Sequence, residues 1–184
     1  MSLIKNNVKL MLKAFAYQIV FSLFGNMLAM GTVSHYVLFL LGSVMIICLT
    51  LYLTYRNFWN AGAKEASGGN KHGANFFSVL LLVLIPAIPS IVVGAVSCTG
   101  SLYYIDGSYT SRFVFLQLQR LFFTGEYVGI FQTLLPPDAV TGYANPYQPL
   151  AFLLAVIPQI CASVFGYMMG LHEKVIIKLP KDVG

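Results

Sequence analysis

The sequence predicts an all-α integral membrane protein, a bundle of four transmembrane helices with an interfacial amphipathic helical segment in its long outer loop. Three observations predict this fold class. The 184-residue chain is 58% hydrophobic and only 9% charged, whereas a soluble domain carries about 25% charged residues. Four apolar runs are long enough to cross a bilayer as helices, which takes roughly 20 residues each. Lysine and arginine are distributed unequally between the connections. We expect one membrane domain, residues 1–184.

The four apolar runs cover about residues 10–30, 36–55, 76–98 and 149–171. The first follows a lysine-containing start, but its apolar stretch exceeds the roughly 7–15 residues of a signal-peptide core, so we predict an uncleaved span. A short hairpin joins the first two runs. A glycine-containing loop, residues 56–75, follows the second, and a long loop, residues 99–148, follows the third.

The basic residues indicate on which side of the membrane each connection lies, because cytoplasmic loops retain lysine and arginine. Nine lie in the N-terminal segment, the loop after the second run and the C-terminal tail, namely Lys5, Lys9, Lys13, Arg56, Lys64, Lys71, Lys174, Lys178 and Lys181. The long loop holds Arg112 and Arg120. We therefore expect cytoplasmic termini, a cytoplasmic loop 56–75, an outer loop 99–148, and residence in the plasma membrane. This bias also explains the net charge of +5, so no nucleic acid partner is expected.

The long loop is too aromatic for a solvated linker, because it holds 11 of the chain's 26 aromatic residues. Polar residues between positions 112 and 123 collect on one helical face, which predicts an amphipathic helix. We expect this helix to lie flat at the outer interface; the alternative is a lid or a docking surface. A fifth span over residues 112–135 would place Arg120 and Glu126 in lipid, at about 2.5–3.5 kcal/mol for each charge. It would also move the basic tail outside, so four spans are favoured.

Three amides lie within the predicted spans: Gln18, Asn26 and Gln159. An isolated amide in hydrocarbon is costly, so we predict a hydrogen bond between Gln18 and Gln159. The alternative is that the amides line a pathway. Pro86, Pro89 and Pro158 are predicted helix breaks, which neighbouring groups can satisfy or which can expose carbonyl groups to a substrate.

Small residues recur along the apolar runs at spacings of three and four, and Gly94, Gly166 and Gly170 belong to these series. Small residues let membrane helices approach closely. The sequence therefore predicts helix packing at these glycines. Gly166 and Gly170 form a GxxxG pattern, for which packing within one chain is favoured over dimerisation.

Recognisable catalytic chemistry is missing from the sequence, which has no GxxxxGK[ST], GxSxG or HExxH pattern. The spacing of cysteine and histidine suggests no metal site. A membrane enzyme would need Asp106, Glu126 and His35 to converge, which no spacing suggests. The predicted spans contain no acid or histidine, which argues against proton-coupled transport. No catalytic residue, cofactor or metal is therefore expected.

Two functional classes fit these patterns. The first is a non-enzymatic accessory or interaction subunit of a membrane assembly, because a large aromatic surface often marks a partner site. Its expected partners are the lipid bilayer and either another membrane protein or a second copy of the chain. The alternative is a small permease or channel for a neutral or amphipathic solute, with the three amides as its polar lining.

Overall fold

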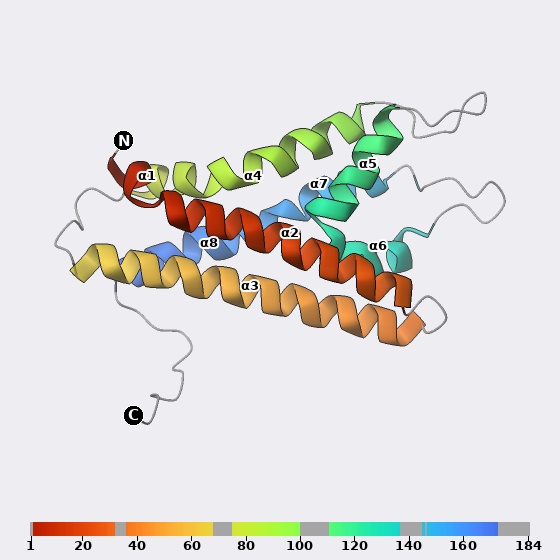
Figure 1. Cartoon of the computed structure of the whole chain (residues 1–184), viewed down its shortest axis with the longest axis horizontal. Helices are drawn as coiled ribbons and strands as arrows, with labels where there is room; N and C mark the ends of the chain where they lie inside the picture. Colours follow the sequence, from red (N-terminus) through yellow and green to blue (C-terminus); the bar gives the residue numbers. More distant parts are fainter. Residues whose placement is uncertain are drawn as a thin grey trace.

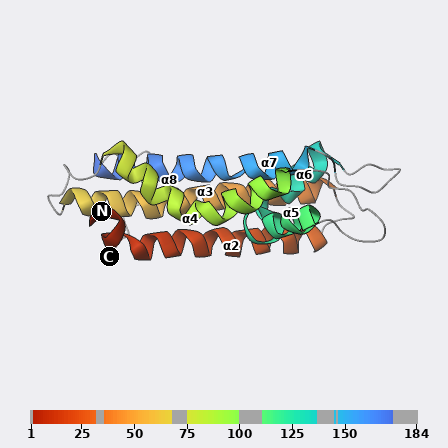
Figure 2. The same cartoon turned by 90° about the horizontal axis from the view of Figure 1, so that it is seen from above.

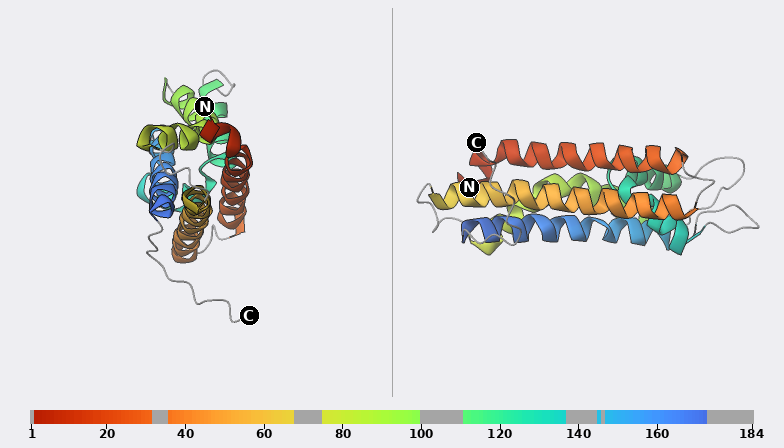
Figure 3. Two further views of the ribbon diagram at one scale, coloured as in Figure 1. Left: turned by 90° about the vertical axis from the view of Figure 1, so that its left-hand side faces the viewer. Right: turned by 90° about the horizontal axis from the view of Figure 1, so that it is seen from below.

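The computed structural model describes residues 2–31, 36–67, 75–99, 111–136, 145 and 147–172, and the regular secondary structure in these ranges is helical. The long helices are α2 (Val8–Gly31), α3 (Tyr36–Ser67), α4 (Phe76–Cys98), and the consecutive pair α7 (Gln148–Leu154) and α8 (Val156–Leu171). By length and composition they give four segments able to cross a membrane. A membrane-embedded helical bundle is therefore indicated. The helices α2, α3, α8 and α4 surround one axis in that order (Figures 1 and 3).

The second predicted span is longer in the structure than in the sequence analysis. α3 continues to Ser67, so much of the predicted loop 56–75 is helix rather than loop. Phe58 and Ala66 are buried in this extension, where α3 packs along α8. Apolar side chains on one face of a polar stretch extend the helix, because they bury that face. A short helix, α1 (Ser2–Asn6), precedes α2. The predicted turn at 32–35 and the basic tail beyond His172 lie outside the described residues.

The prolines act differently from the prediction that all three break helices. α4 runs without interruption through Pro86 and Pro89, because prolines are tolerated in membrane helices whose neighbours satisfy the freed backbone groups. The fourth segment is interrupted at Ala155, between α7 and α8. Pro158 has no N–H to donate to the carbonyl of Leu154, which accounts for the interruption there.

Glycines allow α3 and α8 to pack closely. A methyl group added at Gly166 would lie 2.5 Å from the carbonyl oxygen of Tyr55, and one added at Gly170 would meet the carbonyl oxygen of Trp59. Both glycines of the GxxxG pattern therefore contact another helix of the same chain. Close packing of this kind stabilises helix pairs in membranes, where no hydrophobic effect drives association.

The long loop contains a helical hairpin, made of α5 (Ser111–Phe122), the 3₁₀ turn η2 (Gly125–Tyr127) and α6 (Val128–Leu134). α5 packs against α4 and α2, whereas η2 and α6 pack against α2 and α3. The hairpin lies beside the long helices, in the half of the bundle away from α1 (Figures 1 and 2). The prediction placed this segment flat at the outer interface, whereas the structure packs it alongside α2, α3 and α4. Residues 112–135 do not form a fifth spanning helix, because α5 ends at Phe122 and the chain then turns into η2 and α6.

The two faces of α5 explain this difference. Gln119 and Leu116 are fully buried against the bundle, whereas Val114 and Leu121 are exposed. The buried face of α5 therefore holds one apolar and one polar side chain, and apolar side chains are exposed on the other face. A helix lying on a water-facing surface would have the opposite arrangement, whereas a helix inserted beside membrane spans is expected to expose apolar groups.

Candidate functional site: a re-entrant hairpin with a buried carboxyl group

The tip of the hairpin reaches the middle of α2. The Nε2 of Gln18 donates to the carbonyl oxygen of Phe123 at 3.4 Å, and Gln18 lies near the midpoint of the helix Val8–Gly31. The backbone N–H of Gly125 donates to the hydroxyl oxygen of Ser22 at 2.6 Å. The chain thus enters the bundle, turns at residues 123–127 and returns on the same side, which makes the hairpin re-entrant.

Side chains of α2 satisfy the carbonyl groups at the C-terminal end of α5. The hydroxyl of Ser22 donates to the carbonyl oxygen of Leu121 at 3.0 Å. The carbonyl oxygen of Arg120 lies 3.1 Å from the same hydroxyl and is a second acceptor for it. The Nδ2 of Asn26 donates to the carbonyl oxygen of Arg120 at 2.8 Å. The last carbonyl groups of a helix have no intrahelical donors, and each must find one where water is excluded. Asn26 and Ser22 therefore serve as a cap for α5.

The other long helices also contribute polar contacts to the hairpin. The hydroxyl oxygen of Ser43 in α3 accepts a hydrogen bond from the N–H of Gly129 at 3.1 Å. The Nε2 of Gln119 donates to the hydroxyl oxygen of Ser90 in α4 at 3.1 Å. The Nε2 of Gln148 in α7 donates to the carbonyl oxygen of Leu135 at 2.8 Å. We refer to Ser22, Asn26, Ser43, Ser90 and Gln148 as the socket.

Glycines bring the hairpin backbone against α2 and α3. A methyl group on Gly25 would lie 2.5 Å from the Cα of Glu126 and would also meet the carbonyl oxygen of Gly125. A methyl group on Gly129 would meet the hydroxyl oxygen of Ser43. Only residues without a Cβ allow backbones to approach this closely. The hairpin and the long helices are therefore fitted to each other at the tip.

Glu126 lies at this tip and is the main candidate for a functional group. Its side chain is only 2% exposed, and its Oε2 has no hydrogen-bond partner. Burial raises the pKa of the Glu126 carboxyl above its ordinary value, because removal from water disfavours the charged form. The predicted spans contain no acid, yet the hairpin places one inside the bundle. The absence of acids from the spans therefore no longer argues against proton-coupled transport.

Arg120 is close to Glu126 in sequence but does not neutralise it. The described structure contains no salt bridge between the two residues, and the Nε of Arg120 is buried without a hydrogen-bond partner. The guanidinium carbon instead lies 5.8 Å from the centre of the Phe152 ring, a cation–π geometry. The carboxyl group of Glu126 therefore has no compensating positive charge from this residue.

The predicted hydrogen bond between Gln18 and Gln159 is not formed, because the Nε2 of Gln18 is directed to the hairpin. The two amides nevertheless border the same small cavity, of about 20 Å³, together with Pro86 and Ser163. A cavity of this size holds about one water molecule. The alternative, that the amides line a pathway, stays a prediction, although Gln18 and Gln159 border one cavity.

The remaining predicted residues lie at three places. Asn26 belongs to the socket. Gly94 lies where α4 meets α7 and α5, since an added methyl group would be 2.9 Å from Leu153 and 3.4 Å from the Nε2 of Gln119. Pro89 borders a separate apolar groove between α2 and α4, of about 220 Å³.

Comparisons with known proteins give no family. Neither protein-family models, nor curated proteins, nor solved structures contain a match to this chain. Within the described residues, no group of three histidine, cysteine or acidic side chains is arranged to hold a metal ion.

Sequence reasoning missed Glu126 and most of the socket. Ser22 and Ser90 lie in the apolar runs, where the small-residue pattern predicts helix packing rather than hydrogen bonding to a loop. One signal was present: the polar stretch Thr124–Glu126 separates two apolar helical segments that are each too short to span a bilayer. Two short apolar segments around a polar turn are compatible with a re-entrant structure.

Proposed function

We propose that the protein is a multi-pass plasma-membrane protein of the permease or channel class, that it passes protons, and that Glu126 carries them. The supporting observation is the buried carboxyl group at the tip of a re-entrant hairpin, without a hydrogen-bond partner for Oε2. Ionisable groups inside membrane proteins are costly and mark ion or proton pathways by default. Irregular backbone at this depth occurs where protein or a water-filled cavity surrounds it.

The size of the central cavity favours a proton over a larger solute. About 20 Å³ bordered by Gln18 and Gln159 holds one water molecule, not a neutral or amphipathic solute. A proton can pass along hydrogen-bonded groups and single waters without an open pore. The proposed class is therefore the permease or channel that the sequence offers as its alternative, but it carries protons rather than a neutral or amphipathic solute.

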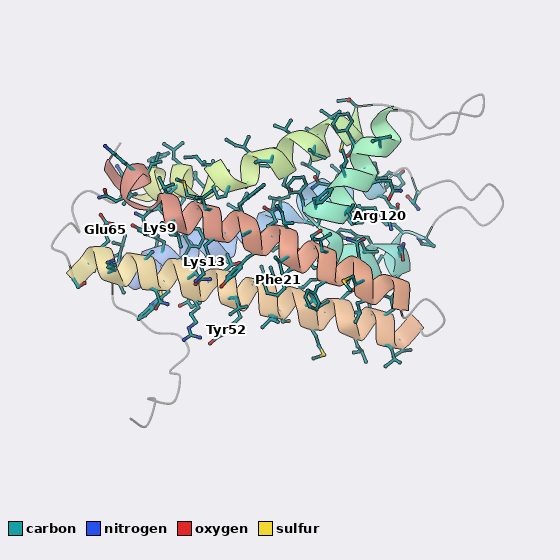
Figure 4. All side chains as sticks on the ribbon, viewed as in Figure 1. Lys9, Lys13, Phe21, Tyr52, Glu65 and Arg120 are labelled. Atoms are coloured by element: carbon teal, nitrogen blue, oxygen red, sulfur yellow. The ribbon has the colours of Figure 1, made fainter. Side chains whose placement is uncertain are left out.

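The proposed orientation has both termini in the cytoplasm and the hairpin entering from outside. Lys9 and Lys13 of α2 lie toward the end of the bundle that carries α1 and Glu65, whereas Arg120 lies in the hairpin toward the other end (Figure 4). Cytoplasmic segments are enriched in lysine and arginine. Glu126 would then be reached from the outer side.

Proton uptake into vesicles tests this function. The protein is reconstituted into potassium-loaded vesicles containing the pH dye pyranine, and valinomycin then sets an inside-negative potential. We expect faster acidification than in protein-free vesicles, loss of the difference in Glu126→Gln, and partial retention in Glu126→Asp. Asp138→Asn, which removes a different carboxyl group, should match the wild type. Wild-type rates equal to protein-free rates, or unaltered rates in Glu126→Gln, would overturn the proposal.

One observation favours a second candidate, the non-enzymatic accessory or interaction subunit. The socket holds the hairpin closely, and the central cavity is small, so the described bundle is closed. A closed bundle fits a protein that supports a membrane assembly or a homo-oligomer. Gentle detergent extraction followed by native mass spectrometry tests it: a stoichiometric companion is expected, and recovery only as a monomer counts against this class.

A further inference from the structure

Two rows of polar side chains meet at the central cavity. On α2, Asn26, Ser22 and Gln18 follow one another at a spacing of four, which places them on one helical face. On α8, Gln159 and Ser163 have the same spacing and border the cavity with Gln18. The row on α2 contacts the hairpin tip, because the hydroxyl oxygen of Ser22 accepts a hydrogen bond from the backbone N–H of Gly125, the residue before Glu126. The cavity therefore lies next to the hairpin tip, since Gln18 borders the cavity and also donates to the carbonyl of Phe123.

The cavity has the features of a site for a single internal water. It has room for one, and a buried water typically needs two to four polar partners. The Nε2 of Gln18 is used by the carbonyl of Phe123, so its amide oxygen can accept from a water. Gln159 and Ser163 supply further polar groups on the opposite wall.

An aromatic ring borders the cavity and also packs in an apolar cluster with Leu3 of α1. Phe58 of α3 borders the cavity and is 1% exposed. It belongs to an apolar cluster that also contains Val83 and Tyr167. The hydroxyl of Tyr167, a member of this cluster, donates to the Oε2 of Glu65 at 3.3 Å. A hydrophobic constriction of this kind prevents passage by excluding water.

We infer that the cavity bordered by Gln18 and Gln159 binds one water on the proton path, and that Phe58 is the gate separating this water from the Tyr167–Glu65 pair. This inference rests on the proposed function. In each transfer an O–H bond of the donor breaks as an O–H bond forms on the next oxygen. The water gains a proton on the side of Glu126 and releases one toward Glu65 when the ring moves aside. The two amides hold the water and are positioning residues.

The gate predicts a gain of function, which a merely destabilised protein would not show. In the pyranine assay, Phe58→Ala should raise the rate of proton uptake severalfold, because it removes the ring between the water and the inner pair. Phe39→Ala removes another buried ring, away from the cavity, and should give no rise. Phe58→Ala combined with Glu126→Gln should fall to the protein-free rate, which distinguishes the path from a general leak.

Two further variants test the water site itself. Ala87→Leu fills the cavity, which Ala87 borders, and Gln159→Leu removes a polar partner; both should lower uptake severalfold. Monodisperse elution and a cooperative thermal transition establish that each variant is folded. If Phe58→Ala gives no rise and both folded cavity variants conduct normally, the inference is wrong, although Glu126-dependent uptake would preserve the proposed function. If the wild type does not conduct, the proposed function itself fails.

Discussion

The hydroxyl oxygen of Ser22, in the middle of α2, accepts a hydrogen bond of 2.6 Å from the backbone nitrogen of Gly125, at the tip of the hairpin. The same hydroxyl lies 3.0 Å and 3.1 Å from the carbonyl oxygens of Leu121 and Arg120. One serine thus joins both sides of the hairpin turn to a long helix. This contact holds Glu126 inside the bundle.

Replacing Ser22 by alanine should destabilise the protein. The change leaves the N–H of Gly125 and a carbonyl group of α5 buried without a partner, at a cost of about 1–3 kcal/mol. Thermal unfolding in detergent measures the effect. Ser67→Ala, at an exposed position at the end of α3, should change stability by less than about 0.5 kcal/mol. Equal effects of the two changes would contradict the docking of the hairpin.

A methyl group at Gly125 should displace the hairpin. It would meet the carbonyl oxygen of Ser22 and the Nδ2 of Asn26, and overpacking of this kind costs about 1–3 kcal/mol. Gly42→Ala is the matched control, because its methyl group would meet only the flexible end of the Leu28 side chain. Unfolding midpoints of the two variants check the difference. A midpoint for Gly125→Ala as high as that of Gly42→Ala would show that the backbones are not in contact.

Gln18 and Gln159 should differ in their contributions to stability. Gln18 donates to the carbonyl of Phe123, and interhelical hydrogen bonds in membranes contribute about 0.6 kcal/mol on average and up to about 1.7 kcal/mol. Gln18→Leu should lose this amount. Gln159→Leu should lose less, because the described structure shows no protein partner for its amide. A larger loss for Gln159→Leu in thermal unfolding would refute the assignment.

Stability should depend on pH through Glu126. Its pKa is raised in the folded state, so between the unfolded and folded values the folded chain holds a proton that the unfolded chain has released. Stability is then highest at low pH and falls as the pH rises through the folded value. Unfolding midpoints across a pH series should show this fall in the wild type and in Asp138→Asn. Glu126→Gln should flatten it; a similar slope in that variant would assign the fall to another group.

The orientation can be tested by labelling single cysteines introduced after replacing the three native ones. Gly142→Cys should react with an impermeant reagent added outside intact cells, and Gly69→Cys should react only after the membrane is opened. These outcomes follow from the distribution of lysine and arginine. Labelling of Gly69→Cys in intact cells would reverse the proposed orientation.

The long helices could be predicted from the sequence because their burial in lipid depends on local composition. The span 76–98 agrees with the observed bounds of α4. The helix over residues 56–67 could not be predicted, because the charged residues in this stretch lower its mean hydropathy although one of its faces, which includes Phe58, is apolar and buried. Local composition does not show that a polar segment packs against a neighbouring helix.

The site could not be predicted from local patterns because its partners are distant in the chain. The amphipathic pattern of α5 indicates two faces, but it does not say whether lipid or protein covers the apolar one. The sequence favours a pair of Gln18 and Gln159 because both are isolated amides at similar depth. In the structure a backbone carbonyl of the hairpin takes the donor of Gln18 instead. The backbone of Glu126 lies against Gly25, and no sequence period connects these two residues.

Infrared spectroscopy of the Glu126 carboxyl group tests the central claim most directly, since it requires no knowledge of the transported species. A protonated carboxyl has a C=O stretching band that a carboxylate lacks. We predict that the wild type retains such a band at neutral pH, that the band disappears as the pH is raised, and that Asp138→Asn leaves it unchanged. The band should be absent from Glu126→Gln under all conditions. A wild-type spectrum identical to that of Glu126→Gln at neutral pH would show that this carboxyl holds no proton, and would contradict the account.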